Sequence, residues 1–209
     1  MSELAPRETP ILAWAVAGMA LEDGQSGDLH AVVPQGDAVL VGLIDGLGHG
    51  PEAARAALAA GEILQRSAGD PLADVVERCH EGIRHTRGVV MTLASFDGRA
   101  SLMTWVAVGN VEAILIRAGH AAGASDYEAI QCRGGVVGYR LPPLSVRTLP
   151  VGDGDLLVMA TDGIRHGFAD AVARARRDPD VATALVLAEF AKGSDDALVI
   201  AARYLGARP

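Results

Sequence analysis

Aspartates stand at the ends of predicted strands at three places in the chain. Asp45 and Asp162 each follow a mostly apolar run, and Asp195 and Asp196 directly precede another. In an antiparallel sheet the start of one strand lies beside the end of its neighbour, so these carboxylates are predicted to converge on a single rim. Clustered carboxylates repel one another unless a cation neutralises them, and Mg²⁺ and Mn²⁺ prefer oxygen ligands. The pattern therefore predicts a divalent metal site.

A simpler interpretation is that the Asp-Gly pairs at 45–46 and 162–163 form turns, as a single Asp-Gly pair usually does. Two such pairs and an Asp-Asp pair, all at strand ends, favour the metal site over coincidence.

The segment 46–50 holds three glycines in five residues, between a predicted strand and a predicted helix. Such a loop lets the backbone approach a ligand closely, and the helix N-terminus behind it favours anions. Residues 48–53 also fit the Gly-x-Gly-x-x-Gly/Ala pattern of dinucleotide-binding folds. That fold needs a second parallel strand after the helix, whereas a second helix follows here, so the dinucleotide interpretation is disfavoured.

Hydrophobic periodicity and turn residues predict an α+β fold with mainly antiparallel strands. Helices are predicted at residues 52–67, from 71 to about 86, and between 167 and 191. Strands are predicted at residues 11–20, 29–33, 38–44, 89–96, 100–108, 111–116, 144–149, 155–160 and 197–204.

Composition limits the class of protein. The 209 residues are 50% hydrophobic, enough for a sizeable core, and residues 1–209 are expected to form one domain. The longest apolar run, 38–44, is far shorter than the roughly 20 residues of a membrane span. A net charge of −8 argues against nucleic acid. The chain begins without a secretory pattern, so a cytoplasmic protein is expected, with Cys79 and Cys132 as buried small hydrophobic residues.

The motifs resemble those of the type 2C metal-dependent protein phosphatases. Residues 41–50, 160–164 and 193–197 match that family in order and spacing. Residues 26–28, 86–88 and 108–111 are further similar to the bacterial branch that contains SpoIIE, and within it to the RsbX-like stressosome phosphatases. The resemblance implies a four-layer αββα sandwich, in which helices flank two antiparallel β-sheets and two Mn²⁺ or Mg²⁺ ions lie at one edge.

The resemblance also implies roles for individual residues. Asp45 should bridge both ions, and the Gly46 carbonyl should bind one of them. Asp162 and Asp195 should hold the other ion.

Other positions near the motifs have less defined roles. Asp28 is a candidate metal ligand, although a Gly-Asp turn would explain it equally well. Asp196 is expected to cap the strand or support the ligands. In the eukaryotic pattern a histidine directly follows the Asp-Gly pair, but Leu47 occupies that position here and His49 comes two residues later. His49 is therefore a candidate catalytic acid, and the identity of the acid stays open. Arg87 lies beside a motif and could contact substrate phosphate, although a surface role is commoner for an arginine.

In the implied mechanism, the two ions activate a water that attacks phosphorus directly, without a covalent enzyme intermediate. No Cys-x5-Arg loop surrounds either cysteine, so a thiolate mechanism is not expected.

The chain is thus predicted to be a metal-dependent phosphoserine/phosphothreonine protein phosphatase. The resemblance implies a phosphorylated bacterial stress-signalling partner, a STAS-domain stressosome protein, and neither nucleic acid nor a membrane is expected as a partner. A catalytically inactive regulator that binds phosphoproteins is the alternative, and intact Asp45, Asp162 and Asp195 count against it. A nucleotide-binding oxidoreductase is the weaker alternative. No attached sensory domain is expected.

Overall fold

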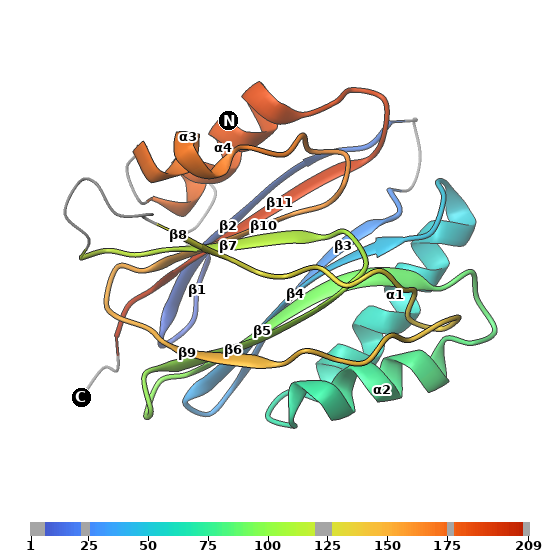
Figure 1. The fold of residues 1–209 in the computed structure, drawn as a ribbon, viewed down its shortest axis with the longest axis horizontal. Coiled ribbons are helices and arrows are strands. Elements are labelled where there is room, and N and C mark those ends of the chain that lie inside the picture. The colour runs from blue at the N-terminus through green and yellow to red at the C-terminus, as the bar shows by residue number, and fades with distance from the viewer. Residues whose placement is uncertain (1–6, 22–25, 120–126, 175–177, 207–209) are drawn as a thin grey trace.

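Two β-sheets stacked face to face form the centre of the molecule, and helices cover both outer faces (Figure 1). The computed structural model describes residues 7–21, 26–119, 127–174 and 178–206. The predicted αββα sandwich is therefore confirmed.

The first sheet has the order β3-β4-β5-β6-β9, and every neighbouring pair is antiparallel. Its strands are β3 (Asp28–Gln35), β4 (Ala38–Gly46), β5 (Val89–Asp97), β6 (Leu102–Val108) and β9 (Arg147–Pro150).

The second sheet has the order β1-β2-β11-β10-β7-β8, and it is also antiparallel throughout. Its strands are β1 (Arg7–Glu8), β2 (Leu12–Met19), β7 (Glu112–Ile116), β8 (Tyr127–Ala129), β10 (Leu156–Ala160) and β11 (Ala197–Tyr204).

Two pairs of helices cover the sheets. Helices α1 (Pro51–Arg66) and α2 (Leu72–Gly82) pack on the first sheet, and α3 (Ala169–Arg174) and α4 (Pro179–Phe190) pack on the second. Helix α1 begins with proline at its first turn and buries a stripe of small residues, which allows a close approach to β4. The Asp178 carboxylate caps α4 by accepting hydrogen bonds from the N–H groups of Asp180 and Val181.

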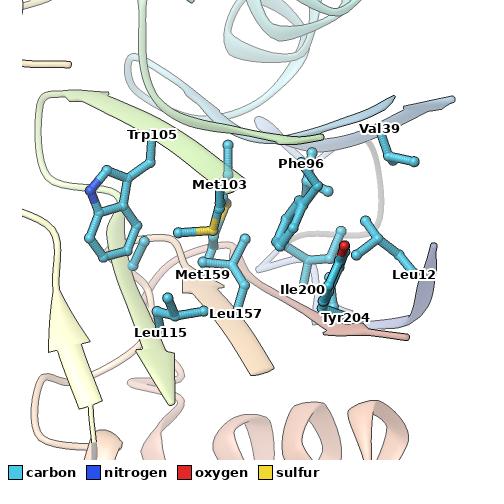
Figure 2. Close-up of a cluster of buried hydrophobic side chains, with 14 of the residues drawn as sticks. Leu12, Val39, Phe96, Met103, Trp105, Leu115, Leu157, Met159, Ile200 and Tyr204 are labelled. Carbon is cyan, nitrogen blue, oxygen red and sulfur yellow. The ribbon is translucent and has the colours of Figure 1, made fainter. Parts of the chain in front are cut away.

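The main core lies between the two sheets (Figure 2). Phe96 and Trp105 come from the first sheet and face Leu157 and Tyr204 of the second. The rings of Phe96 and Tyr204 stack with their centroids 6.1 Å apart. Burial of each large side chain contributes about 1.5–3 kcal/mol, so this layer fixes how the two sheets lie on each other.

Several predicted elements differ from the structure. The strand predicted at 144–149 is β9, and it begins only at Arg147 because Leu144 packs instead against the core under α1 and α2. The short strands β1 and β8 were not predicted. The helical region 167–191 divides into α3 and α4, and its residues 175–177 lie outside the described part.

Cys79 is buried as expected, but the expectation for Cys132 was wrong because this residue is exposed. Within the described residues, no helix combines the length and the apolar character that crossing a membrane requires.

Close backbone contacts lock the strand ends that carry the aspartates. A Cβ atom at Gly163 would overlap the carbonyl oxygen of Asp196, and one at Gly46 would overlap the carbonyl oxygen of Ala53. Only glycine fits at these two positions, because neither obstacle is the end of a flexible side chain.

We expect Gly163→Ala to destabilise the metal-free protein by about 2 kcal/mol or more, because the backbone must shift to admit the methyl group. Gly152→Ala is the matched control, since a Cβ there meets open space, and it should change stability by less than about 0.5 kcal/mol. Urea unfolding with EDTA present measures both. Equal midpoints for the two variants would contradict the close contact at Gly163.

Candidate functional site

Five carboxylates line one hollow of about 320 Å³ at the edge where the two sheets meet: Asp28, Asp45, Asp162, Asp195 and Asp196. They come from both sheets, since β3 and β4 belong to the first sheet and β10 and β11 to the second. The sequence predicted that the aspartates converge, and the structure brings all of them together. Convergence depends on the stacking of two sheets and not on neighbouring strands alone.

Asp28 and Asp45 lie directly opposite each other on the adjacent strands β3 and β4. Like charges at opposed positions of a sheet destabilise it. The pKa of Asp45 is raised to about 8, mainly because the carboxyl is buried and also because Asp28 and the other aspartates repel its charge.

The pKa of Asp28 is likewise raised, to about 7, and burial is again the largest cause. The hydrogen bond from Thr161 opposes this rise, and the charges of Asp196, Asp162 and Asp195 add to it. The folded chain thus concentrates negative charge that it does not itself neutralise.

Two side chains that the sequence analysis did not select hold the aspartates in place. The Thr161 hydroxyl donates to Asp28 Oδ2 at 2.7 Å and accepts from the Leu198 N–H at 2.9 Å. The Asn110 amide donates to Asp162 Oδ2 at 2.9 Å. Thr161 stands directly before Asp162 and Asn110 lies in a predicted turn, but nothing in the sequence pairs either residue with its partner.

Both carboxylate oxygens of Asp196 accept hydrogen bonds from backbone N–H groups. Its Oδ1 accepts from the Leu21 N–H at 2.8 Å, and its Oδ2 accepts from the Gly27 N–H at 2.7 Å. These bonds support the expected role of Asp196 as a support for the ligands. Asp195 is less committed, because its Oδ1 accepts only the neighbouring N–H of Asp196, at 2.9 Å.

The glycine-rich loop forms another part of the wall, where Leu47, Gly48 and His49 line the hollow. Gly48 has φ 86°, a conformation that side chains other than glycine rarely adopt. The Gly46 N–H donates to the carbonyl of Gly27 at 3.0 Å, which joins the loop to the segment before β3. His49 is thus placed at the site, as the sequence analysis proposed for a catalytic acid.

The donor set fits a hard divalent cation. The described residues that line the hollow include five carboxylates and no lysine or arginine. In the described part of the chain, no three His, Cys, Asp or Glu side chains form a ready-made metal cluster. An ion here would complete its coordination with a backbone carbonyl and water, as Mg²⁺ commonly does.

Two stacked antiparallel sheets flanked by helices are the fold of the type 2C protein phosphatases. The chain belongs to the SpoIIE family, because the family model "Stage II sporulation protein E (SpoIIE)" matches residues 35–205. The described strands pair only in antiparallel fashion, which removes the structural basis for the dinucleotide-binding alternative.

Known relatives agree with this assignment. Phosphoserine phosphatase RsbX of Bacillus subtilis is 22% identical over 145 residues, which are 68% of this chain and 70% of that protein. A crystal structure of RsbX with magnesium superposes with a TM-score of 0.84 at 17% identity, over 96% of this chain and 98% of that one. A chain solved in work on the bacterial stressosome, described as a modular system adapted to control secondary messenger signalling, has 29% identity and a TM-score of 0.82. That match covers 92% of this chain and 99% of the solved chain.

Asp45→Asn should stabilise the metal-free protein, and increasingly so as the pH rises. The pKa of Asp45 is 3.8 ordinarily and about 8 in the folded state, so the folded wild type binds the proton more tightly. Wild-type stability is therefore greatest at low pH and is lost as the pH rises through about 8, whereas asparagine does not titrate. Between pH 5 and pH 8.5 the advantage of the variant in melting temperature should grow by about 5 °C or more.

Thermal melts in EDTA at both pH values measure this effect. Asp153→Asn is the control, because Asp153 is an exposed turn residue. An advantage for Asp45→Asn that stays constant with pH would refute the buried, repelled state of Asp45.

Proposed function

We propose that this chain is an active phosphatase that hydrolyses phosphoserine or phosphothreonine in another protein. The convergence of intact Asp28, Asp45, Asp162 and Asp195 on one hollow carries the proposal. A domain that only binds phosphoproteins has no need to keep buried carboxylates whose repulsion costs stability.

In this proposal Asp45, the Gly46 carbonyl, Asp162 and Asp195 would together hold the two divalent ions. Asp28 is a further proposed ligand. When bound, two Mg²⁺ or Mn²⁺ ions supply Lewis-acid activation of water and neutralise charge on the phosphate.

The chain's own groups prepare the site for that chemistry. Asn110 fixes the orientation of Asp162, and Thr161 does the same for Asp28. His49 on the wall of the hollow is proposed to give a proton to the leaving serine or threonine oxygen. Cys79 takes no part, because it is buried in the core under α1 and α2 and burial raises the pKa of its thiol to about 12.

The proposed substrate is a phosphorylated stress-signalling protein of the STAS type. The similarity to a chain of the bacterial stressosome and to a phosphoserine phosphatase supports this choice. The surface near the site also suits a protein partner. Leu58 of α1 is exposed and lines a shallow depression that also includes Asp28, and Tyr139 is 80% exposed on the turn after Val136, which lines the hollow. Exposed aromatic and aliphatic groups of this kind are typical anchors of protein interfaces.

We expect phosphatase activity to vanish on chelation and to return with Mn²⁺ or Mg²⁺ but poorly with Zn²⁺, which prefers sulfur and imidazole ligands.

Asp45→Asn should lower kcat on the order of 10³-fold, as removal of a main electrostatic stabiliser does. Asp162→Asn and Asp195→Asn should have smaller effects. Phosphate release from a phosphoserine peptide provides the assay, and circular dichroism checks folding. Wild-type turnover in excess chelator would overturn the metal mechanism.

A folded phosphorylated STAS-type domain should be hydrolysed with a much higher kcat/KM than a short peptide carrying the same phosphoserine. The folded domain reaches surfaces beyond the hollow, and this binding energy is not available to the peptide. Both substrates should be compared at one Mn²⁺ concentration. Tyr139→Ala should lower kcat/KM for the folded domain and leave kcat/KM for the peptide unchanged, so the difference between the two substrates becomes smaller. Equal efficiencies in the wild type would instead indicate a phosphatase that acts without partner recognition.

A further inference from the structure

Arg87 lies beside the Gly48 loop and lines a second hollow of about 430 Å³ together with Glu52 and Arg55. It belongs to the segment between α2 and β5, and its Nη1 atom lies 3.1 Å from the position that a Cβ at Gly48 would occupy. Gly48 itself lines the hollow. The N–H of Leu47 donates to the carbonyl of Gly88 at 3.1 Å, so the two loops are joined next to the guanidinium. The position of Arg87 relative to the site is therefore set by the backbone.

The charge of Arg87 is the opposite of that in the hollow beside it. The described residues that line the hollow carry five carboxylates and no lysine or arginine. A substrate phosphate carries up to two negative charges and must come close to these carboxylates. A guanidinium beside the Gly48 loop offers the arriving phosphate an attractive partner that belongs to the protein.

Arg87 is held, but weakly and through one nitrogen. Its Nε donates to Glu52 Oε2 at 3.0 Å, and its side chain is about half exposed. Exposed ion pairs of this kind are weak because water competes for both partners. Its Nη1 and Nη2 atoms make no hydrogen bond to another residue in the described part of the chain.

Glu52 is shared between two arginines. Its Oε1 accepts from Arg55 Nη2 at 2.5 Å, while its Oε2 accepts from Arg87. The single carboxylate of Glu52 thus pairs with two guanidinium groups, so this group of three residues carries a net positive charge. Arg55 keeps Glu52 paired when Arg87 turns toward an anion, which lowers the cost of that movement.

We propose that Arg87 is a substrate-binding residue that binds the phosphoryl oxygens of the substrate through Nη1 and Nη2. The planar guanidinium presents two parallel N–H groups that match two oxygens of one phosphate. The adjacent Gly48 has φ 86°, which favours glycine, and a Cβ there would come within 3.1 Å of Nη1. This inference rests on the proposed phosphatase function and names the contact that fixes the phosphate.

The test compares Arg87→Gln with three other variants. Arg87→Lys keeps the positive charge but lacks the planar guanidinium with its paired N–H donors. Glu52→Gln removes the ion pair and keeps Arg87. Arg84→Gln is the matched surface control, since Arg84 is an exposed arginine that pairs with Glu81 on the same helix end. The substrates are p-nitrophenyl phosphate and a phosphoserine peptide at fixed Mn²⁺, and inorganic phosphate is the binding probe.

For Arg87→Gln we expect kcat/KM to fall ~10–100-fold on both substrates, the size expected for loss of a charged hydrogen bond. Inorganic phosphate, measured by isothermal titration calorimetry with Mg²⁺ present, should bind more weakly by a similar factor, while Mg²⁺ binding in the absence of phosphate is unchanged. Both kcat/KM and the affinity for inorganic phosphate of Arg87→Lys should lie between those of the wild type and those of Arg87→Gln. Glu52→Gln and Arg84→Gln should stay within about threefold of the wild type.

Three results would overturn the proposal. Equal losses in Arg87→Gln and Glu52→Gln would show that the ion pair merely holds the loop to α1. A lower kcat/KM of Arg87→Gln on the peptide but not on p-nitrophenyl phosphate would show that Arg87 contacts the peptide and not the phosphate group. Unchanged phosphate binding in Arg87→Gln would also exclude the contact. If the wild type hydrolyses neither substrate, the proposed function fails, whereas the calorimetry still decides whether Arg87 binds phosphate.

Discussion

The repulsion among buried carboxylates is the constraint on which the rest of this structure depends. Asp28 and Asp45 face each other on adjacent strands, and both have pKa values raised by burial and by the other aspartates. Folding has to hold these groups together against their mutual repulsion until a cation neutralises them. The stability needed comes from the apolar layer between the sheets, which includes Phe96, Trp105 and Tyr204. Core and site are therefore energetically opposed, and the core is large enough to dominate.

Hydrogen bonds from neutral side chains hold two of the repelling carboxylates in place. Thr161 connects Asp28 of the first sheet to the backbone of β11 in the second, and Asn110 fixes Asp162. Each bond limits the freedom of one carboxylate without supplying positive charge. The hollow thus keeps its negative charge, because the groups that orient these two carboxylates are neutral donors. Arg87 lies outside this lining and pairs with Glu52.

Sequence reasoning succeeded where the signal was local. The Asp-Gly pairs and the Asp-Asp pair at strand ends predicted that Asp45, Asp162 and Asp195 converge, and the apolar runs predicted the long strands. It failed for β8 and for the start of β9, because short edge strands carry little periodicity and depend on the partner strand. It also could not find Thr161 or the link from Asp196 to Gly27, since these contacts join residues far apart in the chain. The exposure of Cys132 likewise depends on tertiary packing and not on residue type.

The position of β11 has a consequence for how the enzyme comes into being. This strand is the last in chain order, yet it lies between β2 and β10 in the interior of its sheet. Asp195 and Asp196 precede it, and Asp196 fastens the backbone at Gly27, 169 residues earlier. During synthesis, the earlier strands leave the ribosome with a gap in the second sheet and with the loop before β3 unfastened. The hollow can therefore be completed only when β11 is inserted, because the segment before this strand supplies Asp195 and Asp196.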